Sequence, residues 1–375
     1  MPTETLSQPS TPIVYKAKTR LAWVGQALLI AIILTALGII VYNFYLDPVL
    51  FIQIVIGGLQ LGFVYALIAL GYTMVYGIVK LINFAHGDVF MVGAYTSYFV
   101  VTQFNLQNWP AAVFPGMPAA AVTIIGSLSV ILVSMLLCVI MAVTIERVAY
   151  KPLREAPRIA ALITAIGVSF FLEYFGALYF VYSARFIPYE QPFKVVSWYI
   201  SNGIHMIIPG QKPPEHSVTF SSILLLIIAA SILVQVLLQF LVRRTKIGIA
   251  MRAASFDKST ARLMGINVDQ VISFTFAVGA AFAGLGGVLY ATAFSEINTQ
   301  MGILPGLKAF VAAVLGGIGS IPGAFIGALI MGQAEALTAG LVSTPMRDAV
   351  AFTILILVLL IRPTGIFGEP EKEKA

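Results

Sequence analysis

Several polar side chains that could bind a small solute interrupt otherwise apolar stretches of the chain. Asn83, His86 and Asp88 lie close together near the start of one such stretch, with Gly87 between them. Glu173 is the only charged residue of another stretch. If these stretches cross a membrane, burying such groups is costly, so they normally face protein or water. We therefore predict that they line a translocation path, to which we also assign Lys308 and Glu335.

Other interpretations of the same residues remain open. Asn83 could cap the exposed backbone amides at a helix start. Glu173 could be buried against a partner helix, or could reach towards the outer face. His86 has no second ligand nearby in the sequence, so we do not assign it a metal or a proton relay.

The remaining residues indicate neither a metal site nor a catalytic site. The chain has one cysteine, Cys138, and its three histidines are scattered at positions 86, 205 and 216. No GxxxxGK[ST] motif, Ser/His/Asp constellation or carboxylate pair at membrane depth is evident. We predict no catalytic residues, no bound metal and no cofactor.

The composition places these residues in a membrane protein. Of 375 residues, 59% are hydrophobic and only 10% are charged, and the mean hydropathy is +0.95. Soluble domains carry about 25% charged residues. Continuous apolar runs favour helices over the alternating segments of a barrel. The net charge of +6 is concentrated in loops, which indicates membrane orientation and not nucleic-acid binding.

We predict an all-α polytopic integral membrane protein with about ten spans, some of them broken or re-entrant. The eighth span is short and is the candidate for re-entry. The motifs FMVGA (90–94) and AFIGA (324–328) are compatible with an inverted repeat. Loop charges predict that both termini are cytoplasmic. The predicted spans are residues 21–46, 51–79, 81–104, 118–144, 159–182, 218–242, 271–294, 304–318, 321–341 and 349–361.

Three further features complete this outline. Residues 21–46 are longer than the apolar core of a signal peptide, so we favour an uncleaved first span. Gly58 and Gly62 form a GxxxG pair that is either a helix contact face or chance. The largest external segment, residues 183–217, could face a binding protein or form an interfacial cover with aromatic anchors.

Two basic loops are predicted to lie in the cytoplasm. Residues 146–158 are interpreted as a solvated orientation signal. Residues 243–269 contain apolar positions at helical spacing and predict one short amphipathic helix that ends near Gly265. We predict that this helix docks on a cytoplasmic partner through eight residues: Arg252, Ala253, Ala254, Asp257, Ala261, Met264, Gly265 and Ile266.

These segments are similar to the permeases of ABC importers for branched-chain amino acids. The resemblance rests on RAASFDKSTARLMGIN (252–267), GYTMVYGIVKLINFAHGDVFMVGAY (71–95), IERVAYKPLR (145–154), KAFVAAVLGGIGSIPGAFIGALIMGQAEAL (308–337) and VLLIRPTGIFG (358–368). It covers the chain from about residue 51 onwards. We accordingly divide the chain into a tail plus extra first span (1–48), a permease domain (49–368) and a charged tail (369–375).

The resemblance implies a heteromeric importer in the inner membrane. It would contain separate ATPase subunits that bind ATP, a second related permease, and an extracytoplasmic amino-acid-binding protein. The implied substrate is a branched-chain or other neutral amino acid. Importers of urea and short amides share much of the pattern and remain an alternative. An ion-coupled secondary carrier and a membrane anchor without a path are alternatives of other classes.

Overall fold

The computed structural model describes residues 34–35, 37–154, 156–201, 203–208, 210, 212–362 and 364–368. The chain divides into two units, Met1–Ile52 and Gln53–Ala375. Most of the predicted first span lies outside the described residues, as does the tail 369–375. In the first unit, the described residues include an apolar helix over Leu37–Leu46.

Six helices within the described residues are long and apolar enough to cross a membrane. The structure therefore confirms a polytopic helical protein, but it does not confirm ten spans. Three predicted spans correspond to shorter helices: α3 (His86–Thr102), α11 (Ile303–Gly316) and α13 (Met346–Ile361). The six long helices are α2 (Pro48–Val79), α5 (Ala119–Ile145, continued by short turns to Leu153), α6 (Arg158–Gly176), α7 (Ser222–Arg244), α10 (Val268–Phe294) and α12 (Ile321–Leu341).

Short elements connect these helices. A single turn, η1 (Leu106–Asn108), and α4 (Trp109–Val113) follow α3. A π-helical turn, η2 (Glu146–Tyr150), and a 3-10 turn, η3 (Lys151–Leu153), extend α5. Two helices, α8 (Lys246–Phe256) and α9 (Lys258–Leu263), join α7 to α10.

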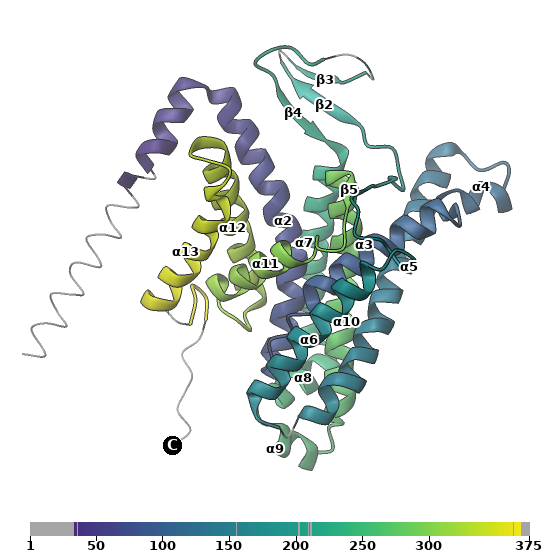
Figure 1. Ribbon diagram of the computed structural model, residues 1–375, viewed down its shortest axis with the longest axis vertical. Coiled ribbons are helices and arrows are strands. Elements are labelled where there is room, and N and C mark those ends of the chain that lie inside the picture. Colours follow the sequence, from purple (N-terminus) through teal and green to yellow (C-terminus); the bar gives the residue numbers. More distant parts are fainter. Residues whose placement is uncertain are drawn as a thin grey trace, which may run out of the picture. The chain divides into compact units, whose positions relative to one another are not determined.

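The predicted external loop contains strands, which the sequence analysis missed. Three strands pair antiparallel in the order β3-β2-β4, namely β2 (Ser197–Ile200), β3 (Ile204–Met206) and β4 (Val218–Ser221). β4 occupies the start of the predicted span 218–242, so α7 begins only at Ser222. A second pair joins β1 (Ile187–Pro188) to β5 (Glu296–Ile297). The three-stranded sheet lies at one end of the bundle, and α8 and α9 lie at the opposite end (Figure 1).

The buried core of the second unit is built around α2. Its residues from Val64 to Leu70 are almost completely buried. α2 also makes a close contact with α12, where a side chain at Gly332 would lie 2.3 Å from the Gly62 nitrogen. A side chain added at Gly58 or Gly62 would likewise collide with α12. The GxxxG pair is therefore a helix contact face, as small residues allow where lipid provides no hydrophobic drive.

Two interruptions set the ends of the shorter helices. α2 ends at Val79, Lys80 adopts a left-handed conformation, and α3 starts only at His86. The predicted span 81–104 therefore begins later than expected. Between α11 and α12 the chain turns at Gly317 and Gly319, both with positive φ. Ile366 and Phe367 donate backbone hydrogen bonds to the last carbonyls of α11 and so satisfy groups that a helix end leaves unpaired.

The α2–α12 contact predicts an unequal response to adding one methyl group. We expect Gly332→Ala to lower the unfolding temperature in detergent, because the new Cβ meets only backbone atoms of Gly58 and Gly62. The control is Gly167→Ala in α6, where nothing lies within 4 Å and alanine favours the helix by about 0.5–1 kcal/mol. Equal unfolding temperatures for the two variants would contradict this packing.

Candidate functional site

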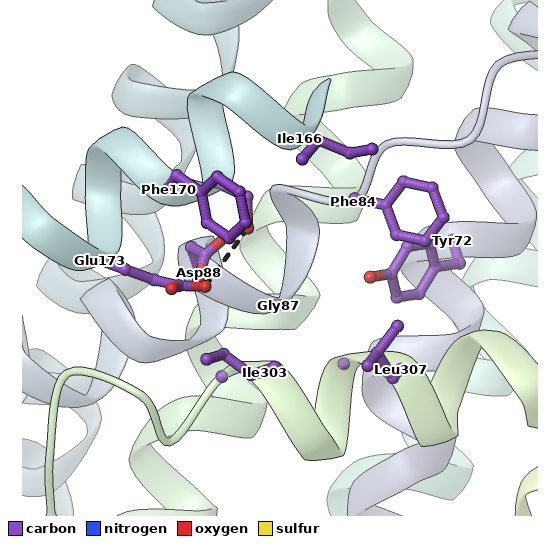
Figure 2. A pocket seen from close by; sticks show the side chains of 12 residues that line it. Tyr72, Phe84, Gly87, Asp88, Ile166, Phe170, Glu173, Ile303 and Leu307 are labelled. Carbon is purple, nitrogen blue, oxygen red and sulfur yellow. Dashed lines mark hydrogen bonds between the residues drawn. The ribbon is translucent and has the colours of Figure 1, made fainter. Parts of the chain in front are cut away.

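A cavity of about 240 Å³ lies between α3, α6 and the start of α11 (Figure 2). Its wall is largely apolar. Its polar side comes from Asp88, Ser169 and Glu173, of which Asp88 and Glu173 point towards one another. The apolar side chains that line it are Phe84, Ile166, Phe170, Ile303 and Leu307.

The two carboxylates are joined through a serine. The Ser169 hydroxyl donates to Asp88 Oδ2 at 2.5 Å and lies 3.5 Å from Glu173 Oε1. Asp88 is 2% exposed and Glu173 is 7% exposed. Glu173 is therefore not a lone acid, and the expectation of no carboxylate pair was wrong. Neither the pair nor Ser169 could be predicted from the sequence, because the acids lie far apart in the chain and meet only when α3 packs on α6.

Glycines let α3 and α11 begin side by side at this cavity. A side chain on Gly87 would lie 2.5 Å from the Gly302 carbonyl oxygen and 3.2 Å from the Gly306 Cα. Only a residue without Cβ fits there. The contact brings the first turns of both helices to the cavity wall. It also explains why position 87, which lies between two ionisable residues, is a glycine.

Asn83 and His86 were predicted on the path but do not line this cavity. The Asn83 side chain accepts a hydrogen bond from the Tyr150 hydroxyl at 2.6 Å. It does not cap α3, because the helix starts later and its N-cap, Ala85, has no side-chain hydrogen bond. His86 packs edge-on against Tyr72, and a side chain at Gly71 would collide with its ring. Both residues hold the start of α3 in place.

Lys308 and Glu335 form a separate buried cluster of charges. Lys308 Nζ lies 2.7 Å from Glu335 Oε1 and 2.7 Å from Asp348 Oδ1. Arg347 Nε lies 3.1 Å from Glu335 Oε1, and the Tyr65 hydroxyl donates to Glu335 Oε2 at 2.8 Å. These pairs join α2, α11, α12 and α13. Because their charges satisfy one another away from the cavity, we now interpret Lys308 and Glu335 as positioning α11.

Lys308→Met should destabilise the protein strongly. The Glu335 carboxylate is 1% exposed, and the substitution leaves it with Arg347 as its one cationic partner among the described residues. Leaving a buried charge fully unpaired costs about 3–5 kcal/mol, which is the upper limit for this variant. We expect a lower unfolding temperature in detergent than for the matched control Lys212→Met, whose side chain is exposed in a loop. A Lys308→Met protein that unfolds at the control's temperature would contradict this role.

A third cluster of charged residues lies in the turns that follow α5. It corrects the prediction that residues 146–158 form a solvated loop. Glu146 is completely buried and pairs with Arg154. Glu146 also accepts a hydrogen bond from the Ser273 hydroxyl at 2.7 Å, and Arg154 reaches Asp269 at 2.6 Å. Residues of the predicted orientation signal thus tie α5 to α10. They border a larger cavity of about 610 Å³ that also touches α8 and α9.

The predicted docking helix is in fact two helices. The backbone is extended at Asp257, which separates α8 from α9. The Asp257 carboxylate accepts hydrogen bonds from the backbone nitrogens of Ser259 and Thr260 and so caps α9. Arg252 Nη1 donates to the Val242 and Arg243 carbonyl oxygens near the end of α7. These two charges, which we expected to orient a partner, instead make contacts within the chain. The stop at Gly265 is confirmed, with φ +83 directly after α9.

The remaining docking residues divide by exposure. Ala254 and Ala261 are buried within this chain, which favours a supporting role over direct contact with a partner. Ala253 and Ile266 are partly buried against the core. Met264 is 78% exposed, and its neighbour Leu263, which the sequence analysis did not select, is 87% exposed.

Comparison with protein families matches residues 54–359 to the branched-chain amino acid transport system permease component. The high-affinity branched-chain amino acid transport system permease protein LivH of Escherichia coli K12 is 41% identical over 328 residues, which are 86% of this chain and 97% of that protein. The corresponding permease protein BraD of Pseudomonas aeruginosa is 40% identical, over 86% of this chain and 98% of BraD.

More distant relatives extend the comparison. The probable branched-chain amino acid transport permease protein LivH of Methanocaldococcus jannaschii is 27% identical over 80% of this chain and 88% of that protein. No solved structure matches the chain significantly.

Proposed function

Because the chain belongs to the branched-chain amino acid transport permease family, we propose that it forms the membrane path of an ABC importer for branched-chain amino acids. The nearly full-length similarity to high-affinity permeases carries this proposal. The carboxylate-lined cavity supports it, because a small polar solute needs polar partners inside an apolar bundle.

We infer the partners from the absence of an ATP-binding motif in the sequence and from the charges of its basic loops. The sequence contains no Walker A motif, so we propose that separate ATPase subunits bind ATP and that this chain carries no cofactor. A second permease and an extracytoplasmic amino-acid-binding protein would complete the importer. The basic loops at 146–158 and 243–269 support a cytoplasmic position for that end of the bundle in the inner membrane, with both termini on the same side.

The ATPase would bind the surface formed by the end of α9. Leu263 and Met264 are exposed there, beside the mostly exposed Arg262. Large exposed apolar side chains rimmed by polar residues are typical of interaction sites. A basic loop next to them supports a position in water and not in lipid. We assign direct contact to these residues, and a supporting role to Arg252, Ala254, Asp257 and Ala261.

Motion at this surface has a short route to the cavity. Lys258, the first residue of α9, donates from Nζ to the Val79 carbonyl oxygen at 3.0 Å. Val79 ends α2, and the non-helical residues that follow lead directly into α3 and Asp88. We propose that displacement of α9 is transmitted by this route. Such coupling requires the ATPase to prefer one of two arrangements of the bundle.

Leu263→Asp combined with Met264→Asp should weaken ATPase binding. Truncating or charging central interface residues commonly reduces affinity about tenfold or more. The measurement is the amount of ATPase subunit that co-purifies with the permease. The matched control is Ile204→Asp combined with Met206→Asp, which charges two exposed residues of β3 at the opposite end of the bundle. Undiminished ATPase binding by the α9 variant would contradict the docking surface.

The energy source separates this proposal from an ion-coupled carrier. In vesicles that contain the assembled importer and its binding protein, leucine uptake should continue when ionophores dissipate the ion gradients. It should stop when ATP is withheld, because the ATPase subunits supply the energy for transport. Uptake by the chain alone, or uptake that needs an ion gradient and no ATP, would favour the carrier.

A further inference from the structure

In the part of the chain that the structure describes, two acidic side chains and no basic one line the small cavity. Its lining includes the carboxylates of Asp88 and Glu173, and among the described residues that line it there is no Lys, Arg or His. Ser169 is the one side chain that bridges the two acids. Buried charges in proteins are normally paired, because an unpaired ion loses its hydration without compensation. The cationic partner of this pair is therefore missing from the cavity wall.

The helices compensate only one of the two acids. Asp88 lies in the first turn of α3, where the helix dipole stabilises a negative charge. Glu173 lies in the last turn of α6, which ends at Gly176, and there the dipole opposes a negative charge. An acid at that position therefore does not stabilise the helix end. Its presence in a cavity wall indicates a ligand that supplies positive charge.

We infer that Asp88, Ser169 and Glu173 bind the ammonium group of the transported amino acid. This inference rests on the proposed function and specifies the chemistry of its site. An ammonium group has three donors and no acceptor, so it fits two carboxylates and a hydroxyl oxygen. Hydrogen bonds to charged groups are among the stronger ones in proteins.

The apolar part of the cavity suits the aliphatic side chain of such a substrate. Phe84, Ile166 and Leu307 provide an apolar wall opposite the acids, against which an aliphatic side chain can pack. The volume of about 240 Å³ is below the roughly 300–1,000 Å³ of sites for drug-sized ligands. Urea and short amides carry no ammonium group, so they would leave both acids unpaired. The site therefore favours amino acids over those substrates.

Two isosteric substitutions test the assignment in the complete importer. With saturating binding protein and ATP in vesicles, Asp88→Asn and Glu173→Gln should each reduce leucine uptake about tenfold or more, because each loses a charge-assisted contact. The ATPase subunits should still co-purify. The matched control is Glu296→Gln, an exposed acid of β5, which should transport normally. Normal uptake by both cavity variants, while the wild type transports leucine, overturns the inference.

Thermal unfolding separates a binding role from a structural one. Glu173→Gln removes an uncompensated charge, so its unfolding temperature in detergent should equal or exceed that of the wild type. An acid that merely stabilised the fold would give a lower temperature, and that result also overturns the inference. Failure of the wild-type importer to take up leucine at all would instead refute the proposed function.

Competition identifies which group of the substrate the acids contact. In a binding assay with radiolabelled leucine on the wild-type permease–ATPase complex without binding protein, 3-methylbutylamine should compete. This compound is leucine without its carboxylate. The deaminated compound, 4-methylpentanoate, should compete at least about tenfold more weakly. The reverse order, competition by urea, or no saturable leucine binding would each contradict the ammonium site.

Discussion

The requirement that backbone polar groups inside a membrane be covered by protein governs this structure. A helix satisfies its own amides and carbonyls, but every interruption exposes some of them. The chain interrupts its helices after Val79 and after Gly316, and in both places other segments pack over the break. Gly87, Gly302 and Gly306 allow that packing, since backbones meet there with no side chain between them. The cavity exists because two helices can begin in the interior.

Buried ionisable residues in the described part of the chain fall into two kinds. The Lys308–Glu335 and Arg154–Glu146 clusters contain both signs, and each ties together helices that are distant in the sequence. The pair in the cavity contains one sign only. The first kind holds the bundle in one arrangement, whereas the second leaves a position for a group from outside. Sequence position does not distinguish them, because all are isolated charges in apolar segments.

The local features were predictable, and the long-range ones were not. Hydrophobic length located α2 and α12 closely. The strands in 183–217 were missed because pairs of two to four residues leave no clear periodicity. Ser169, Glu146 and Leu263 were missed because their roles depend on which segments meet in space. The burial of Ala254 and Ala261 was not predicted because helical spacing does not reveal which face is covered. The inverted repeat stays a prediction.

The hydrogen bonds from Ile366 and Phe367 to the end of α11 also bear on how the protein is made. α11 leaves the ribosome well before the segment that pairs with its final carbonyls. Until that segment emerges, those carbonyls need water or a temporary neighbour in the insertion machinery. The C-terminal end of α11 is consequently capped only after the chain has been made as far as Phe367.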